Sequence, residues 1–457
     1  MTEIHADYLV VGAGACGMAF VDALIDHADV RVVLVDRRHA AGGHWLDAYP
    51  FVRLHQASAL YGVASTLLGN GTLQTRGPEK GLHERALGAE VVAYYARVLE
   101  RLLASGQVRF HPACNHLGGH QFASMLSGRR YQVSESARVV DARYAEPDIP
   151  SRTPPPFQVA EGVQVVPVNG LAHLTEAPSR YVVVGSGKTA TDACTWLLGN
   201  GVEPDAICWV RPRDAWMLNR ARVQPDPTVM TGMAADTMQA AIDASSIEDL
   251  FLRLEDAGVM LRIDRNVMPT MAKLPTIAQW EIDQLATIED VVRLGYLRRV
   301  EPGRLVLSHG EVGVAADAVV VHCAASALTY PPLVPIWGRD AITLQTVRAA
   351  FPCFSAAAIG YVEATRANDD EKNRICFPSP MSNSLASWAR MQVLGNRAAR
   401  ALSAEPDIKA WSQGTAINPS RVPPDRVDDP AVQAAAERYR AVVRPGLARL
   451  AELAGPG

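Results

Sequence analysis

The feature that most constrains this chain is a glycine-rich turn that occurs twice, each time between an apolar run and a helical pattern. The first copy spans residues 12–17 (GAGACG) and follows the apolar run 7–11. Apolar residues then recur at helical spacing over 18–26, and a second apolar run over 30–35 ends at Asp36. The order of strand, glycine turn, helix, strand and acid predicts the first half of a βαβ nucleotide-binding unit.

Each residue type in the first copy has a physical reason to be there. Gly12 allows the tight turn, Gly14 lets the backbone approach a pyrophosphate, and Gly17 lets the helix pack closely on the sheet. The free N–H groups of the helix N-terminus attract the anion. Asp36 stands where a carboxylate can accept hydrogen bonds from ribose hydroxyls, so the first copy predicts an FAD site.

The second copy spans residues 185–190 (GSGKTA) and differs from the first in its charges. Lys188 lies within the turn, where its ammonium could face a phosphate. Arg211 stands after the next apolar run, at the place where the first copy has its acid. An arginine there can pair with a 2′-phosphate, which predicts NADPH. The alternative is that Arg211 and Arg213 are ordinary solvated charges that follow a strand.

The two copies are too far apart to be two halves of one Rossmann sheet. We therefore predict an α/β fold with two Rossmann-like dinucleotide-binding domains. The FAD domain is expected to be discontinuous, over 1–175 and 326–457, and the NADP domain to span 176–325 with a helical insertion at about 226–300. A stretch with five prolines, 147–156, reads as a linker at a boundary.

Outside the two glycine turns, two stretches have helical periodicity and one is a run of charged residues. Residues 82–103 predict a long amphipathic helix, and residues 430–453 predict a helix near the end of the sequence. The charged run 369–374 reads as a solvated loop, with a cover over the active site as the alternative.

Charge and cysteine content exclude several classes of function. With 44 basic and 48 acidic residues there is no cationic excess for nucleic acid. The sequence has no apolar run near the ~20 residues that cross a bilayer. The seven cysteines are dispersed and include no C-x-x-C pair, so we expect reduced thiols in a cytoplasmic protein, with no redox dithiol and no metal site.

Two further motifs follow Asp36. Residues 42–45 read GGHW, and residues 49–56 read YPFVRLHQ. With these motifs and the two glycine turns, the chain resembles the two-dinucleotide-domain flavoprotein monooxygenases: flavin-containing monooxygenases, N-hydroxylases and Baeyer–Villiger enzymes. The resemblance implies that 49–56 passes beneath the flavin ring, and that 320–326 (VVHCAAS) replaces an Ala-Thr-Gly-type strand end.

The chain departs from the family at a motif that would assign it to a subclass. Members usually carry a phenylalanine–glycine–histidine fingerprint before the second glycine turn, whereas here 167–176 (PVNGLAHLTE) has His173 with no matching Phe-x-Gly before it. The chain therefore looks like a divergent branch, with no subclass assigned.

The resemblance implies an NADPH-dependent FAD monooxygenase that oxygenates a small organic substrate with O2 through an oxygen adduct at flavin C4a. Two alternatives stay open: an FAD/NADPH reductase without oxygen transfer, and an FAD-binding protein that is not an enzyme. The sequence leaves open the substrate, the atom oxidised (N, S or C) and assembly into a homo-oligomer.

His55 is the predicted catalytic residue, because it could donate a hydrogen bond or shuttle a proton near the flavin. The alternative is a polar side chain that only packs against the ring. The predicted cofactor-binding residues are Gly12, Ala13, Gly14, Ala15, Cys16, Gly17, Asp36, Arg37, Gly43, His44, Trp45, Arg53, His55, Gln56, Cys114, Gly185, Ser186, Gly187, Lys188, Thr189, Ala190, Arg211 and Arg213.

Overall fold

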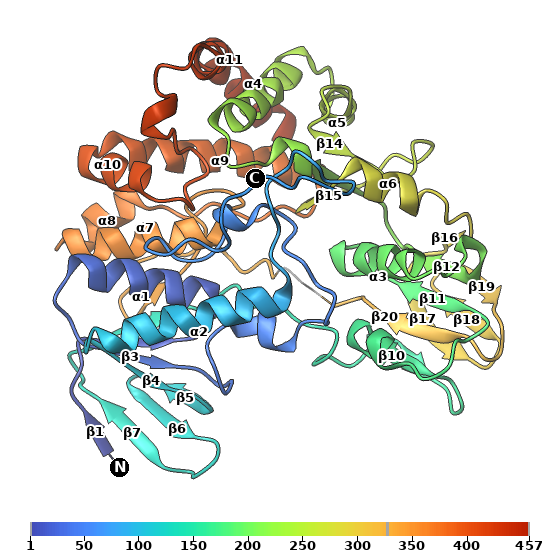
Figure 1. Cartoon of the computed structure of the whole chain (residues 1–457), viewed down its shortest axis with the longest axis horizontal. Helices are drawn as coiled ribbons and strands as arrows, with labels where there is room; N and C mark the ends of the chain where they lie inside the picture. The colour runs from blue at the N-terminus through green and yellow to red at the C-terminus, as the bar shows by residue number, and fades with distance from the viewer. Residues whose placement is uncertain (1, 326–328, 456–457) are drawn as a thin grey trace.

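The computed structural model describes residues 2–325 and 329–455, and it contains two separate five-stranded parallel sheets (Figure 1). Ser326, which ends the predicted strand-end motif, lies outside the described residues. The first sheet has the order β21-β8-β2-β3-β4. Its strands are β2 (Tyr8–Val11), β3 (Val32–Val35), β4 (Val108–His111), β8 (Arg138–Asp141) and β21 (Ile342–Thr343). The two predicted strands beside the first glycine turn are confirmed.

Both faces of the first sheet are covered, which explains why β2 and β3 are continuous apolar runs. Val10 and Leu34 pack against the helices α1 (Ala15–His27), α2 (Gly88–Ala104) and α7 (Pro352–Thr365). Leu9 and Val33 face a four-stranded sheet of order β1-β7-β6-β5. Its strands are β1 (Thr2–Ile4), β5 (Cys114–Gly118), β6 (Gln121–Ser124) and β7 (Arg130–Val133). We call this assembly the first lobe.

The second sheet repeats the arrangement with the order β10-β20-β11-β12-β16. Its strands are β10 (Val165–Pro167), β11 (Tyr181–Val184), β12 (Ile207–Val210), β16 (Val291–Val292) and β20 (Val319–His322). One face carries α3 (Lys188–Gly199) and α6 (Gln279–Leu285). The other carries a sheet of β9 (Gln158–Val159), β17 (Leu297–Glu301), β18 (Arg304–Leu307) and β19 (Gly310–Gly313). This second lobe therefore recruits β9 and β10, which precede residue 176.

The segment 226–300 is less helical than predicted. It contains α4 (Pro227–Asp243), α5 (Ile247–Asp256) and α6, but also β14 (Met260–Leu261) and β15 (Met271–Ile277). These two strands flank β13 (Ala215–Asn219) in a small sheet. The pattern misses β15 because its pairing partner lies far away in the sequence, and pairing decides strand formation more than local propensity does.

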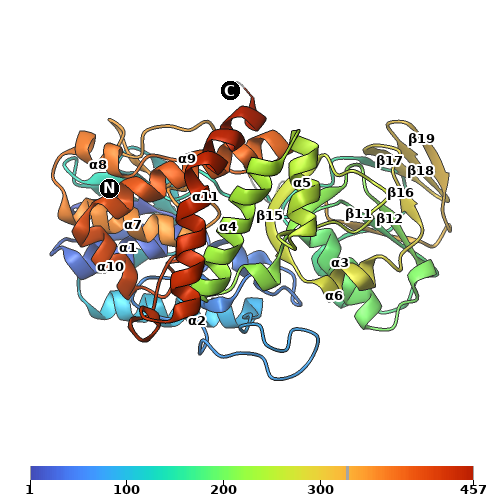
Figure 2. The same cartoon turned by 90° about the horizontal axis from the view of Figure 1, so that it is seen from above.

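A helical layer joins the small sheet to the C-terminal part of the chain. Helix α4 lies beside α11 (Pro430–Ala454), as Figure 2 shows, and α9 (Leu385–Ala404) packs against α11 as well. Trp216, Phe251, Trp388 and Leu450 fill the core between these elements. The predicted helix over 430–453 is confirmed as α11.

Two local predictions need correction. The helix predicted over 82–103 begins at Gly88, because the residues before it pair with an earlier segment: Leu54 N–H donates to the Ala86 carbonyl at 3.0 Å. The charged run predicted as a solvated loop is helix α8 (Asp369–Ile375), which Asn368 caps. Lys372 in that helix is buried and bridges to Glu363 at 2.6 Å.

The described residues offer neither a membrane-crossing helix nor a cluster of metal-binding side chains. No helix within 2–325 and 329–455 is long and apolar enough to cross a membrane. Over the same ranges, no group of three His, Cys, Asp or Glu side chains could hold a metal ion.

The close packing of α1 on α7 depends on a glycine. A Cβ at Gly360 of α7 would lie 2.5 Å from the Phe20 carbonyl oxygen of α1, whereas a Cβ at Gly232 of α4 would meet nothing within 4 Å. We expect Gly360→Ala to lower the free energy of unfolding by about 1–3 kcal/mol through overpacking. The control Gly232→Ala should raise it by about 0.5–1 kcal/mol, because alanine is the better helix former. Denaturant titration measures both. Equal stability of Gly360→Ala and wild type would contradict the close approach of the two helices.

Candidate cofactor and active site

The first glycine turn joins β2 to α1 at the carboxyl edge of the first sheet. A Cβ at Gly17 would lie 1.8 Å from the Gly12 carbonyl oxygen, so glycine is required for this packing. A Cβ at Gly43 would lie 2.8 Å from Gly14 Cα, and Gly42 N–H donates to the Ala13 carbonyl at 2.9 Å. The backbone of the GGHW motif thus runs along the turn. This all-backbone cradle fits a pyrophosphate at the N-terminus of α1, between Gly14 and the residues that follow.

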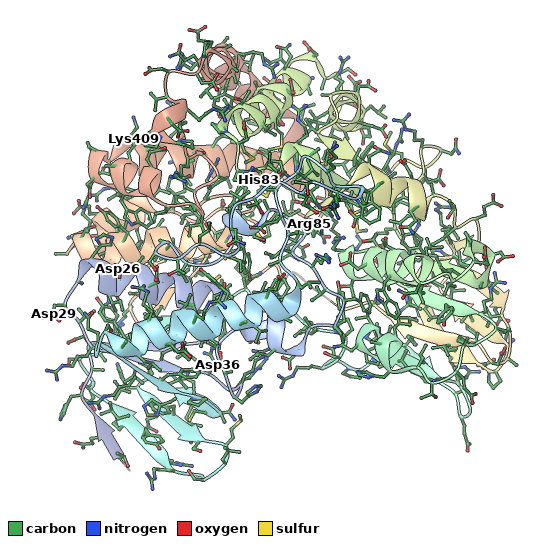
Figure 3. The ribbon with its side chains drawn as sticks, viewed as in Figure 1. Asp26, Asp29, Asp36, His83, Arg85 and Lys409 are labelled. Atoms are coloured by element: carbon green, nitrogen blue, oxygen red, sulfur yellow. The ribbon has the colours of Figure 1, made fainter. Side chains whose placement is uncertain are left out.

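Asp36 directly follows β3 and is only 5% exposed. Its Oδ2 accepts a hydrogen bond from Ala13 N–H at 2.7 Å, and its Oδ1 accepts one from Arg38 N–H at 2.7 Å. Each carboxylate oxygen keeps a further lone pair that a ribose hydroxyl could use. Figure 3 shows Asp36 at the end of the first sheet that lies toward the second lobe. The donor set fits the ribose of FAD.

Two neighbours of this turn have partners of their own, and a third is an uncharged histidine. Arg37 is exposed and pairs with Glu146 at 2.5 Å. The Trp45 indole N–H donates to Tyr61 Oη at 2.7 Å, so this ring packs inside the first lobe. Burial, followed by the charge of Arg38, lowers the pKa of His44 to about 4, which leaves this ring neutral.

Three further predicted cofactor-binding residues, Cys114, Arg53 and Gln56, have hydrogen-bond partners within the protein. Cys114 N–H donates to the Asp36 carbonyl at 2.9 Å, but the thiol lies in the apolar core, where burial raises its pKa. Arg53 is exposed and donates to the Arg85 carbonyl at 3.4 Å. Gln56 is buried and donates to the Leu60 carbonyl at 3.3 Å. The structure therefore gives Arg53 and Gln56 partners within the protein and places the Cys114 thiol in the apolar core.

The second glycine turn joins β11 to α3 in the same way. Gly185 has a φ of +136°, and a Cβ there would lie 3.1 Å from the Cys323 carbonyl oxygen. Ala190 is fully buried where α3 meets the sheet, so a small residue is needed at this position. Gly187 is the N-cap of α3, while Ser186 and Thr189 are half-buried at the turn. These features fit a second pyrophosphate site.

Arg211 follows β12 as Asp36 follows β3, so the structure confirms that the two residues occupy equivalent places. The arginine is not a solvated surface charge: its side chain is 2% exposed and its guanidinium lies over the Trp209 ring, 4.7 Å from the centroid. Nη2 pairs with Asp214 Oδ1 at 2.6 Å. Arg213, by contrast, is exposed. A phosphate at Arg211 would compete with Asp214.

Lys188 belongs to a buried charge cluster rather than to an open turn. Its Nζ pairs with Asp192 and, at 3.1 Å, with Glu281 of α6. We call Glu79, Arg85, Lys188, Arg220 and Glu281 the Arg220 cluster. A phosphate ligand would have to share Lys188 with both carboxylates.

Arg220, at the end of β13, is the centre of this cluster, with a side chain only 1% exposed. It pairs with Glu79 of the first lobe and, through Nη2, with Glu281 at 2.6 Å. Arg85 also holds Glu79, at 2.7 Å. Burial raises the pKa of Glu79, but the hydrogen bond from Arg85 and the charge of Arg220 outweigh it and lower that pKa to about 2. Figure 3 shows Arg85 near the middle of the molecule, between the two sheets.

His55 contacts this cluster. Its carbonyl accepts a hydrogen bond from Arg220 Nε at 2.9 Å and another from Thr276 Oγ1. Its ring Nδ1 accepts from Thr276 N–H at 3.3 Å. Burial and the nearby cations, Lys188 first, lower the pKa of His55 to about 3. The ring is therefore neutral at ordinary pH, and its proton resides on Nε2.

The segment that the resemblance places beneath the flavin also touches the second lobe. Tyr49 Oη donates to Asp192 of α3 at 2.6 Å, and Phe51 stacks on Trp196 of the same helix with 4.5 Å between ring centroids. Residues 49–56 thus connect the two glycine-turn sites. Sequence reasoning missed Glu79, Arg220, Thr276 and Glu281, which belong to no motif. Each is a single polar residue in an ordinary segment, so no sequence signal could have grouped them.

Several solved structures resemble this chain at low identity. A flavin-containing monooxygenase from Stenotrophomonas maltophilia matches at 14% identity over 80% of this chain and 98% of that one, with a TM-score of 0.42. Cyclohexanone monooxygenase with bound cyclohexanone matches at 13% identity over 97% and 99%, with a TM-score of 0.48. The bacillithiol disulfide reductase of Bacillus cereus matches at 12% identity over 80% and 100%, with a TM-score of 0.47.

No protein-family model matches the chain. Curated relatives are much more similar in sequence. The uncharacterized protein Rv2000 of Mycobacterium tuberculosis and the uncharacterized protein Mb2023 of Mycobacterium bovis are both 43% identical over 421 residues. The match covers 91% of this chain and 78% of each relative. The chain belongs to the family of these two mycobacterial proteins.

Proposed function

We propose that the protein is an NADPH-dependent FAD monooxygenase that acts on a small organic molecule. The observation that supports this most is the pair of glycine turns on separate parallel sheets, with Asp36 after one strand and Arg211 at the equivalent place after the other. The acid suits the ribose of FAD, and the arginine suits the 2′-phosphate of NADPH. Two dinucleotide sites in one chain favour electron transfer between their cofactors.

The reaction balances as follows. NADPH, one proton, O2 and the substrate give NADP⁺, water and a product with one added oxygen atom. FAD, when bound, supplies the step between the two-electron donor and O2. The protein contributes binding, orientation and protection from water.

The chain's own residues have distinct roles in this proposal. The backbone around Gly14 and Gly43 holds one pyrophosphate, and the N-terminus of α3 holds the other. Asp36 orients the FAD ribose, and Arg211 binds the extra phosphate. His55 offers its Nε2–H as a fixed, uncharged hydrogen-bond donor.

The first test asks whether oxygen reaches a product. We expect the purified protein to carry one FAD per chain and to oxidise NADPH with matched O2 uptake. With ¹⁸O2 and a panel of amines, sulfides and ketones, mass spectrometry should find one labelled atom in the product of an accepted substrate. Flavin reduction that passes electrons only to dyes or proteins would indicate a reductase instead. A chain that binds FAD but is not reduced would indicate a protein that is not an enzyme.

The second test concerns Asp36. We expect Asp36→Ala to weaken FAD binding by roughly 1.5–3 kcal/mol, because a charge-assisted hydrogen bond to the ribose is lost. Flavin fluorescence on titration measures the Kd. The same carboxylate holds Ala13 N–H and Arg38 N–H, so thermal unfolding of the FAD-free protein is the control. Unchanged FAD affinity would show that Asp36 does not touch the ribose.

The third test separates Arg211 from its ion-pair partner. We expect Arg211→Ala to lower the ratio of kcat/KM for NADPH over NADH about tenfold or more, equivalent to ~1.4 kcal/mol. Asp214→Asn should raise the same ratio, because it removes a negative charge that competes with the phosphate for Arg211. Arg213→Ala, at the neighbouring exposed arginine, is the matched control. An unchanged ratio in Arg211→Ala would assign the 2′-phosphate to another group.

A further inference from the structure

We infer that Arg220, directly after β13, is a positioning residue that, together with Thr276 of β15, holds His55 against the small sheet and fixes its ring as an Nε2–H donor. The inference rests on the proposed function for the purpose of that donor. The arrangement of His55, Arg220 and Thr276 rests on the hydrogen bonds between them.

Three hydrogen bonds reach His55 from the small sheet: two hold its backbone and the third holds its ring. Arg220 Nε and Thr276 Oγ1 both donate to its carbonyl oxygen, which fixes the backbone. Thr276 N–H donates to ring Nδ1, which fixes the ring. A backbone N–H can only donate, so Nδ1 must carry its lone pair toward Thr276. The proton of the neutral imidazole is then on Nε2, on the far side of the ring.

The fork of the arginine matches its acceptors. Nε reaches the His55 carbonyl, Nη1 pairs with Glu79, and Nη2 reaches Glu281 and the Thr276 carbonyl. A lysine offers three donors at one point and could not span these groups. Arg220 is thus bonded both to His55 and to Thr276, the residue that orients its ring.

Burial and, after it, the charges around His55 keep the ring in its neutral form. Lys188, Arg220 and Arg85 disfavour a further proton, whereas Glu281 favours one. Glu79 and Asp192 are the other carboxylates of this region, and both are already paired with these cations. A neutral ring has one donor and one acceptor nitrogen, so its single N–H has a defined direction.

A purely structural role for Arg220 is the competing explanation. Glu79 has other donors, namely Arg85 and the Trp280 indole at 3.2 Å, so part of the cluster could survive without Arg220. Arg222 offers a matched control on the same turn. It pairs with Asp236, its side chain is 27% exposed, and none of its recorded bonds reaches His55 or Thr276.

The experiment reads the His55 ring directly. Protein with ¹⁵N- and ¹³C-labelled histidine is studied by NMR as the FAD-loaded and FAD-free full chain, with His55→Gln to assign the signal. In wild type we expect a pure Nε2–H tautomer that does not titrate between pH 5 and 9. Thr276→Val keeps the backbone N–H that bonds Nδ1 but removes the hydroxyl bond to the His55 carbonyl, and Arg220→Lys removes the Nε bond to the same carbonyl. Either change releases the His55 backbone, so the ring should shift from the Thr276 N–H and mix its tautomers. Because water then reaches the ring, the pKa of His55 should rise toward its ordinary value near 6.5. Arg222→Lys should leave both unchanged.

Kinetics then connect the ring to the reaction. We expect His55→Gln and Arg220→Lys to lower kcat by a similar factor, on the order of 10²-fold, with the KM for NADPH within about twofold of wild type. Such a split points to orientation rather than to lost nucleotide binding.

The outcomes separate this inference from the proposed function. An unchanged tautomer and pKa in both Arg220→Lys and Thr276→Val would overturn the inference, and Thr276→Val decides alone if Arg220→Lys does not fold. A changed ring state in a protein that never oxygenates anything would support the positioning role and contradict the proposed function.

Discussion

Burial of the Arg220 guanidinium is the constraint on which the arrangement of the two lobes depends. A cation that water does not reach must be neutralised by protein groups, and breaking such a buried pair costs about 3–5 kcal/mol. Glu79 lies in the segment before α2, where Arg85 connects it to the Leu54 carbonyl of the first-lobe core, whereas Glu281 comes from α6 in the second lobe. Both acids can meet Arg220 at once only if these two parts of the chain are packed against the small sheet. The cluster contains Lys188 of the second glycine turn and bonds the His55 carbonyl, so it fixes His55 relative to that turn.

Much of the fold could be predicted because its signals are local. The apolar runs at 7–11 and 181–184, each followed by a glycine turn and a helix, specify strands and turns within about thirty residues. The wrong predictions concern segments whose structure depends on contacts with residues far away in the sequence. Residues 271–277 become a strand because β13 pairs with them, and the charged run 369–374 becomes a helix whose Lys372 is buried beside Glu363.

For the candidate site, likewise, the positions of residues could be predicted but their partners could not. Spacing along one βαβ unit places Asp36 and Arg211 after their strands, and the structure confirms those places. Spacing cannot show what each side chain meets across the fold. Asp214 neutralises Arg211, and Glu281 engages Lys188 from another element. Partners of this kind depend on tertiary packing, so a motif predicts the position of a charge better than its availability.

Asp36 and Arg211, the charged residues that follow β3 and β12, have opposite surroundings. In the proposed function this difference determines nucleotide selectivity. The recorded bonds of Asp36 come from backbone N–H groups, which orient the carboxylate without cancelling its charge. Arg211 is instead paired with an acid and stacked on Trp209. An incoming 2′-phosphate must displace or share Asp214, so the selectivity gained is the difference between two ion pairs rather than the full strength of one. In the proposed function, selectivity for the 2′-phosphate therefore depends on Asp214 as much as on Arg211.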